Sequence, residues 1–248
     1  MEASTLASDF PQAPIQDRKT TSRPLPDSGV VDLLLRSPSS FLAQLDDETR
    51  RVAVARAMLL TIIGGAAAFG ASVGIYRGGA QTLVTALKLP LVELVTAILC
   101  APALTALNGG MHGKSDLRRD FALLLSAFAL ATLVLAGLAP VMLLARCYGV
   151  EYHRAIMVLI GCCALGGIAG SSLLVRGLPG SGPRQGFVGL VLLLMVIVVG
   201  TQVSWTFRPY IGRPSQSSVP LFRSVESNFL DASTTAARSA DGIYRSTP

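Results

Sequence analysis

Five long apolar runs set the fold class of this 248-residue chain. Each run holds roughly twenty mostly hydrophobic residues, the length at which an α-helix crosses about 30 Å of hydrocarbon. Only helices and closed barrels cross a bilayer, because every backbone polar group must be satisfied inside the protein. The runs therefore predict an all-α, polytopic membrane protein with about five transmembrane helices. The expected spans are 57–76, 89–107, 121–145, 155–175 and 187–207.

Composition supports this fold class and excludes some functions. Hydrophobic residues make up 51% of the chain and charged residues only 15%, a balance that is rare in soluble domains. The net charge of +6 is spread over tails and loops without a compact basic patch, so nucleic acid is not an expected partner. The arginines that flank the runs instead favour a bilayer with anionic headgroups.

The segments outside the runs are expected to be polar or amphipathic. Residues 1–28 are rich in Pro, Ser and Thr and predict a disordered tail. Residues 29–56 hold two short apolar turns separated by Pro38. They predict an amphipathic juxtamembrane segment that lies on the membrane surface, docks on the helices or binds a partner. In the C-terminal tail, 208–248, apolar residues recur every three or four positions and predict an amphipathic helix at about 219–232.

The second run, 81–108, is the only one with ionisable residues near its middle. Lys88 and Glu93 are separated by about 140° around a helix, and Pro90 lies between them and can bend that helix. Three interpretations remain open. Lys88 snorkels to the interface from a helix that starts near Leu89, the two residues pair with each other or with other helices, or they serve transport or a proton relay. The polar residues that could line a path are Lys88, Glu93, Asn108 and Gln202.

No catalytic, cofactor or metal-binding constellation is expected. The four cysteines show neither a CxxC motif nor a Cys/His ligand spacing. Residues 108–115, NGGMHGKS, miss the phosphate-binding loop pattern by one residue and lack the strand-to-helix setting that this loop needs. The chain is therefore predicted not to be an enzyme.

Small residues predict where helices pack closely. Gly70 and Gly74 in the first span, and Gly166 and Gly170 in the fourth, repeat at the four-residue step that lets a second helix approach. Packing within the chain is favoured over a dedicated dimer interface.

A third group of residues is expected at the membrane interface. Trp205 lies at the end of the last run, where an aromatic belt belongs. The helix is expected to end at Arg208, because Pro209 follows it. The candidates for interfacial anchoring or partner docking are Trp205, Arg208, Pro209, Phe222, Arg223 and Phe229.

Several motifs resemble a widespread family of uncharacterised, multi-spanning bacterial inner-membrane proteins over about residues 30–230. They are LLLRSPSSF (33–41), GGAQTLVTALKLPL (78–91), LCAPALTALN (99–108), GTQVSWTFRPYIGRP (200–214) and LFRSVESNF (221–229). The resemblance implies a bacterial inner-membrane location and no settled activity. The layout is also similar to that of Yip-type membrane proteins, which implies a non-enzymatic role in organising membranes or recruiting partners.

The expected function follows from this layout and from the lack of chemistry. We expect a non-enzymatic scaffold or accessory subunit that anchors or organises a membrane-associated complex, with a protein partner or a homo-oligomer. The alternative is a small transporter or channel subunit that uses the intramembrane polar residues. The positive-inside rule favours a cytoplasmic N-terminus with five spans; a re-entrant second run would place both ends in the cytoplasm.

Overall fold

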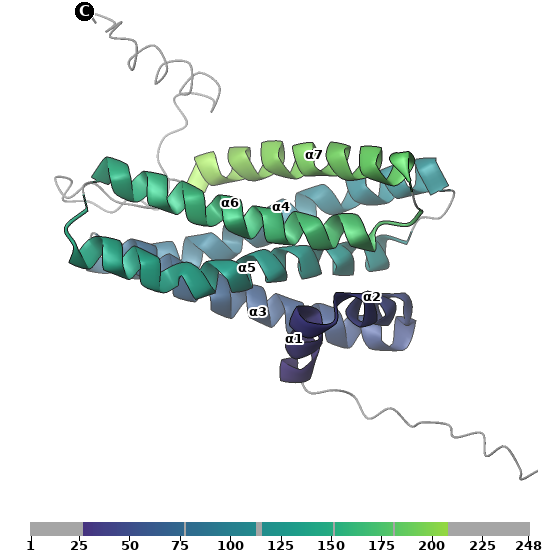
Figure 1. The fold of residues 1–248 in the computed structure, drawn as a ribbon, viewed down its shortest axis with the longest axis horizontal. Coiled ribbons are helices and arrows are strands. Elements are labelled where there is room, and N and C mark those ends of the chain that lie inside the picture. The colour runs from purple at the N-terminus through teal and green to yellow at the C-terminus, as the bar shows by residue number, and fades with distance from the viewer. Residues whose placement is uncertain (1–26, 77, 113–115, 151, 181, 208–248) are drawn as a thin grey trace, which may run out of the picture.

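A computed structural model describes residues 27–76, 78–112, 116–150, 152–180 and 182–207 (Figure 1). These residues form seven helices and no strands. The helices are α1 Asp27–Arg36, α2 Pro38–Asp46, α3 Glu48–Gly74, α4 Ala80–His112, α5 Leu117–Cys147, α6 Tyr152–Gly177 and α7 Pro183–Phe207. Five of them, α3 to α7, are long and apolar enough to cross a membrane. The predicted all-α, multi-pass fold is therefore confirmed.

Two of the long helices, α3 and α5, begin at polar caps that lie outside the apolar runs. The Asp47 carboxylate accepts a hydrogen bond from the backbone N–H of Thr49 (3.0 Å) and caps α3. Asp116 caps α5 in the same way, by accepting from the backbone N–H groups of Arg118 (3.0 Å) and Arg119 (3.1 Å). These caps satisfy N–H groups that the helix itself leaves without acceptors. The helices therefore start earlier than hydrophobicity alone indicates.

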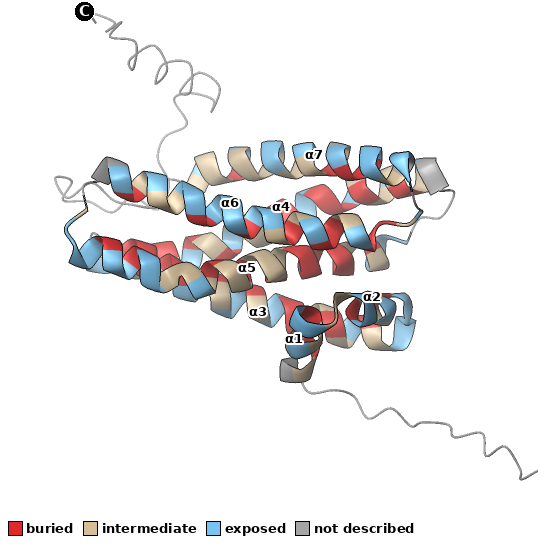
Figure 2. Cartoon of the chain, in the orientation of Figure 1, coloured by how far each residue is buried: buried red, intermediate tan, exposed pale blue. Residues whose placement is uncertain are grey.

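The five long helices lie side by side along one axis (Figure 1). Helix α5 packs against α3, α4 and α6, while α7 packs mainly on α4 and only lightly on α6. Buried residues lie on the sides of the helices toward the inside of the bundle, and many residues on the outer side of α6 and α7 are exposed (Figure 2). That outer surface carries large apolar side chains such as Ile168, Phe187 and Val198, which suits contact with lipid.

The amphipathic segment before the first span docks on the bundle. Helix α1 packs on α3, and α2 packs on both α3 and α5. Their buried apolar side chains are Val30, Leu34, Phe41 and Leu45. The opposite face of α1 is solvated and carries an exposed ion pair between Arg36 and Asp32 at 2.6 Å. The sequence left three locations open for this segment: the membrane surface, the helix bundle or a partner. In the structure it packs on the helix bundle.

Gly70 and Gly74 lie where the backbones of α3 and α4 touch. A Cβ atom added at Gly70 would lie 2.6 Å from the carbonyl oxygen of Thr85. One added at Gly74 would lie 2.6 Å from the Cα atom of Thr82. Both distances are too short for a real contact, so only glycine permits this approach.

Gly166 and Gly170 play the same part between α6 and α5. Added Cβ atoms would lie 3.0 Å from the carbonyl oxygen of Ala131 and 2.6 Å from that of Ala127, respectively. All four glycines that the sequence marked for packing therefore lie at helix contacts within the chain.

Candidate functional site

Helix α4 carries buried polar side chains along most of its length, and we call these residues the buried polar residues of α4. They are, each at most 3% exposed, Gln81, Thr85, Lys88, Thr96 and Asn108. The two threonines are satisfied within the helix, because each hydroxyl donates to the carbonyl one turn earlier, at 2.9 Å from Thr85 to Gln81 and 2.7 Å from Thr96 to Val92. The Gln81 amide nitrogen donates to the Thr85 hydroxyl oxygen at 3.1 Å, also within the helix. Among the described residues, the side chains of Lys88 and Asn108 make no such hydrogen bond within α4.

Lys88 is buried about two turns inside α4. Its amino group, Nζ, has no hydrogen-bond partner among the described residues. The snorkelling interpretation needs a helix that starts near Leu89, whereas α4 starts at Ala80. Within the described part of the chain Lys88 is also not paired with Glu93, which points to a different side of the helix. Lys88 is thus a buried amine without a local counter-charge.

Glu93 faces α5, where its Oε2 atom lies in hydrogen-bond contact with the Thr132 hydroxyl. The same hydroxyl oxygen lies 2.8 Å from the carbonyl oxygen of Phe128. A hydroxyl has one proton and can donate to only one of these two acceptors. If Glu93 is a carboxylic acid, it donates to Thr132, which then donates to Phe128. This contact therefore fits the protonated acid better than the carboxylate.

Asn108 forms a buried pair with Asp120. The Asn108 amide nitrogen, Nδ2, donates to Asp120 Oδ1 at 2.8 Å, and each side chain is 2% exposed. The bond joins the last turns of α4 to the first turn of α5. The sequence singled out Asn108 but missed Asp120, because an acidic residue in the first turn of a helix normally serves the helix dipole at the surface.

Arg51 of α3 links α3 to α2 and to α5, at the end of the bundle where α5 begins. Its Nε donates to the carbonyl oxygen of Leu45 at the end of α2 (2.9 Å), and its Nη1 lies 2.7 Å from Asp116 Oδ2 at the start of α5. The Arg51 side chain itself is largely buried in α3. One side chain of α3 therefore fixes the ends of two neighbouring helices.

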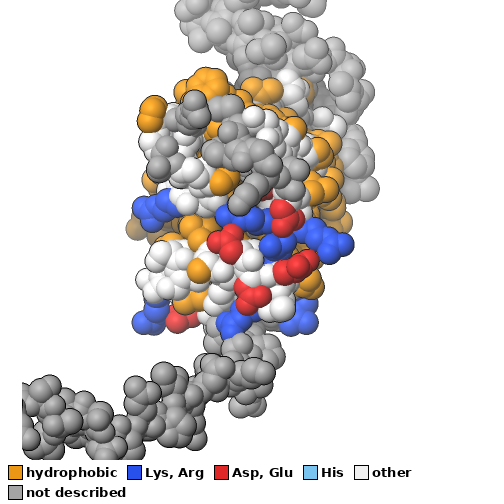
Figure 3. Space-filling model, turned by 90° about the vertical axis from the view of Figure 1, so that its right-hand side faces the viewer, with side chains coloured by type: hydrophobic (Ala, Val, Ile, Leu, Met, Phe, Trp, Pro, Cys, Tyr) orange, Lys and Arg blue, Asp and Glu red, His pale blue; other side chains and the backbone are white. Residues whose placement is uncertain are grey.

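Arg119 of α5 makes a second set of such contacts, with α2 and with the end of α6. Its Nε lies 2.7 Å from Asp46 Oδ1, and its Nη2 donates to the carbonyl oxygen of Gly177 at 3.3 Å. Figure 3 looks onto this end of the molecule and shows acidic and basic side chains gathered there. We name the four residues Asp46, Arg51, Asp116 and Arg119 the charged platform.

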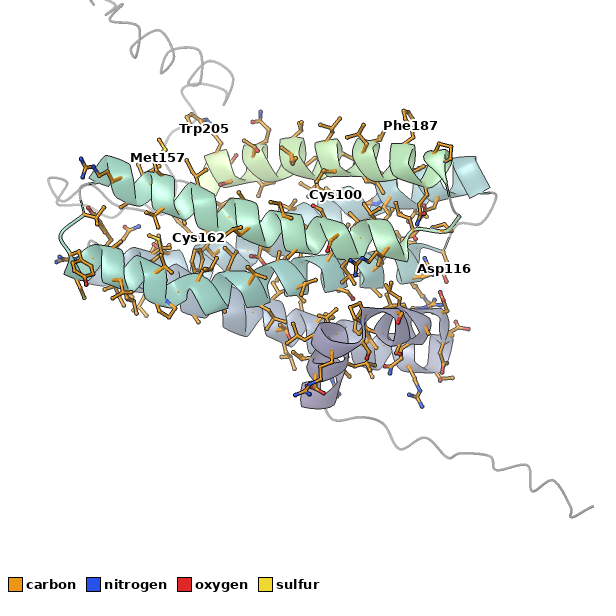
Figure 4. All side chains as sticks on the ribbon, in the orientation of Figure 1. Cys100, Asp116, Met157, Cys162, Phe187 and Trp205 are labelled. Carbon is orange, nitrogen blue, oxygen red and sulfur yellow. The ribbon has the colours of Figure 1, made fainter. Side chains whose placement is uncertain are left out.

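The remaining predicted residues are not brought to these contacts. Gln202 is exposed on α7, because the buried side of that helix runs through Val188, Leu192 and Val203. Gln202 therefore does not point toward the buried polar residues of α4. Trp205 lies in the last turn of α7, at the opposite end of the bundle from Asp116 (Figure 4). The residues that lie outside the described part of the chain are Arg208, Pro209, Phe222, Arg223 and Phe229.

The platform predicts a dependence of stability on acid. Burial raises the pKa of Asp116, but the Arg119 backbone N–H and the Arg51 guanidinium outweigh this, so its pKa lies below the ordinary value. A carboxyl with a depressed folded pKa stabilises the fold above its unfolded pKa, and this is lost as pH falls through the folded value. Thermal unfolding in detergent should therefore show lower stability below about pH 4.

Asp116→Asn tests this assignment, because asparagine keeps the helix cap but not the charge. The variant should lose about 1 kcal/mol or less at neutral pH, since the pair is half exposed, and its stability should depend less on acid. An unchanged acid dependence would contradict the assignment.

No group of three or more His, Cys, Asp or Glu side chains in the described residues is placed to hold a metal ion. Comparison of the chain with protein-family models, with curated proteins and with solved structures finds no match. Function must therefore be argued from the platform and from the buried polar residues of α4.

Proposed function

We propose that this chain is a non-enzymatic scaffold or accessory subunit of the bacterial inner membrane, and that its charged platform docks a protein partner. The proposal rests on the hydrogen bonds and ion pairs that Arg51 and Arg119 make with neighbouring helices. These contacts fix the ends of α2, α3, α5 and α6 relative to one another. A rigid, charged surface at one end of a bundle suits the anchoring of a membrane-associated complex.

The charge pattern around the platform favours a protein over lipid alone. The platform end carries charges of both signs outside the platform itself: Arg118, Asp47 and Glu48 are exposed, and Arg50 Nε lies 3.6 Å from Asp47 Oδ2. An anionic bilayer surface matches only the arginines. A partner with charges of both signs matches the whole pattern and gains specificity from it.

The distribution of arginine supports a cytoplasmic platform. In the described residues, Arg50, Arg118 and Arg176 belong to the platform end, together with Arg51 and Arg119. The opposite end has Arg146 and Arg154. The positive-inside rule then favours a platform, and an N-terminus, in the cytoplasm.

A matched pair of charge reversals tests the proposal. Arg118 and Arg154 are both exposed and both lie in the first turn of a long helix, but at opposite ends of the bundle. The full chain, expressed at its native level, is purified in a mild detergent, and the proteins that accompany it are quantified by mass spectrometry. Arg118→Glu should lower the recovery of a stoichiometric partner at least tenfold, whereas Arg154→Glu should leave it unchanged.

Two results would contradict the scaffold proposal. One is recovery of the chain alone, as a monomer or a homo-oligomer. The other is an equal loss of partner in both variants, because the platform would then not be the docking surface.

A small transporter or channel subunit is the second candidate, and the buried polar residues of α4 favour it. Lys88 lacks a partner among the described residues, and Glu93 is held by a hydroxyl rather than by a cation. Against it, Cys100 and Leu104 are fully buried and separate these residues from Asn108. The polar groups therefore form no continuous line through the described helices.

A further inference from the structure

Two buried oxygen atoms at the contact between α4 and α5 have no hydrogen-bond partner within the part of the chain that the structure describes. They are Oδ1 of Asn108 and Oδ2 of Asp120. Their side chains already share one hydrogen bond, from Asn108 Nδ2 to Asp120 Oδ1 at 2.8 Å. Each side chain is 2% exposed, so bulk water does not satisfy these atoms. Both are acceptors, and both therefore lack a donor.

A single proton can satisfy both atoms. A carboxylic acid has one O–H donor and one acceptor oxygen, and an amide has two N–H donors and one acceptor oxygen. With the proton on Oδ2, Asp120 can donate to Asn108 Oδ1 while its Oδ1 accepts from Asn108 Nδ2. An ionised carboxylate has two acceptors and no donor, and leaves the amide oxygen unsatisfied.

We propose that Asn108 and Asp120 form a buried proton-binding site, in which Asp120 carries the proton at neutral pH. The proton joins α4 to α5 directly beneath the charged platform. This inference goes beyond the proposed function and does not rest on it.

The charged groups around the pair are engaged elsewhere. Arg51 of α3 binds Asp116 and the carbonyl of Leu45, and Arg119 of α5 binds Asp46 of α2 and the carbonyl of Gly177. Arg176 of α6 is exposed. The Thr105 hydroxyl of α4 is within hydrogen-bonding reach of Asp120, but it has one proton, which it donates to the carbonyl of Ala101 at 3.1 Å. No described arginine or lysine makes an ion pair with Asp120, which removes the usual reason for a buried carboxyl to stay ionised.

A metal cation fits the same position less well than a proton. Hard cations in proteins take about six or more oxygen ligands. Asn108 and Asp120 contribute only two unpartnered oxygens. The third oxygen, Asp120 Oδ1, already accepts a hydrogen bond from the Asn108 amide N–H. Sodium is nonetheless tested directly below.

Infrared spectroscopy of the full chain in lipid, with carbon-13 in the aspartate side-chain carboxyls, tests the proposal first in the wild type and then in two variants. At neutral pH we expect a protonated-carboxyl band that shifts with the label. Asp120→Asn should remove this band, and Asp116→Asn, an exposed and ion-paired neighbour, should retain it. No label-sensitive acid band, or a band that Asp120→Asn leaves unchanged, would overturn the proposal. Loss of the band on addition of sodium would also overturn it, in favour of a cation site.

Thermal unfolding gives a second readout that depends on the hydrogen bonds. In Asp120→Asn the new amide can donate to Asn108 Oδ1 and accept from Asn108 Nδ2, so the midpoint should equal or exceed that of the wild type. Asp120→Leu removes both bonds and should lower the midpoint. A midpoint for Asp120→Asn as low as that for Asp120→Leu would show that the charged carboxylate is required, and the proton site would be wrong. Partner recovery, which tests the proposed function, is measured separately.

Discussion

Lys88→Met is expected to stabilise the protein, by about 2 kcal/mol in the free energy of unfolding. A lysine at the centre of a membrane helix costs about 2.5–3.5 kcal/mol to insert, and Lys88 lies about two turns inside α4, so the expected gain is somewhat smaller. The Lys88 side chain is 3% exposed, and its amino group has no hydrogen-bond partner among the described residues. Methionine has a similar length and flexibility and removes the polar head while it fills the same space. Reversible unfolding in mixed micelles measures the change.

Arg154→Met is the control for this substitution, because it removes an exposed cation at a helix end and should change stability by less than about 0.5 kcal/mol. A Lys88→Met protein that is less stable than the wild type would show that Lys88 is paired in the membrane. The pairing group would then lie outside the described residues or in another molecule.

The same position separates the two candidate functions. The double variant Lys88→Met, Glu93→Gln removes both ionisable groups, and the glutamine amide can still donate to Thr132. For a scaffold, we expect partner recovery at the wild-type level. For a transporter, ion flux into vesicles should be lost while the protein still assembles.

Gly70→Leu should be among the most damaging single changes in the bundle, with a loss of about 3 kcal/mol. Even a Cβ atom at Gly70 would lie 2.6 Å from the carbonyl oxygen of Thr85 and 2.9 Å from the Cα atom of Ala86. Both neighbours are backbone atoms of α4, so relief requires that two helices move apart. Unfolding in mixed micelles again measures the loss.

Gly64→Leu is the matched control on the same helix. A Cβ atom added there meets nothing within 4 Å, and the position is exposed. Leucine should be neutral or slightly stabilising, because it is a better helix former than glycine. Equal losses at Gly64 and Gly70 would mean that the α3–α4 contact does not limit stability.

The number and type of the long helices could be predicted from the sequence, because a bilayer demands long apolar helices and the chain contains five such runs. The helix starts could not be predicted in the same way. Asp47 and Asp116 cap α3 and α5 from polar sequence outside the runs, where hydrophobicity carries no signal. The docking of Phe41 and Leu45 on the bundle could not be predicted either, because the same amphipathic pattern would also suit a membrane surface.

Three of the five residues in the buried polar contacts could be predicted from the sequence, and none of the charged platform. Lys88, Glu93 and Asn108 stand out because they are polar within an apolar run. Their partners do not stand out. Thr132 is an ordinary residue in a membrane helix, and Asp120 resembles a surface acid in a first helical turn. Pairing across two helices depends on how the helices rotate against each other, which no local pattern records. Gln202 was included for its polarity, but its position on α7 faces away from the buried side.

The two contacts of Arg119 also form at different times during synthesis, because their partners lie far apart in the sequence. Arg119 binds Asp46, made earlier, and the carbonyl of Gly177, made two spans later. Domains generally form as the chain leaves the ribosome, N-terminal parts first. Here the amphipathic helices are made first, Asp46 gains its partner when the start of α5 has been made, and Arg119 gains its second contact only when α6 is complete. The charged platform therefore reaches its full set of contacts late, and a chain truncated before Gly177 should lack one of them.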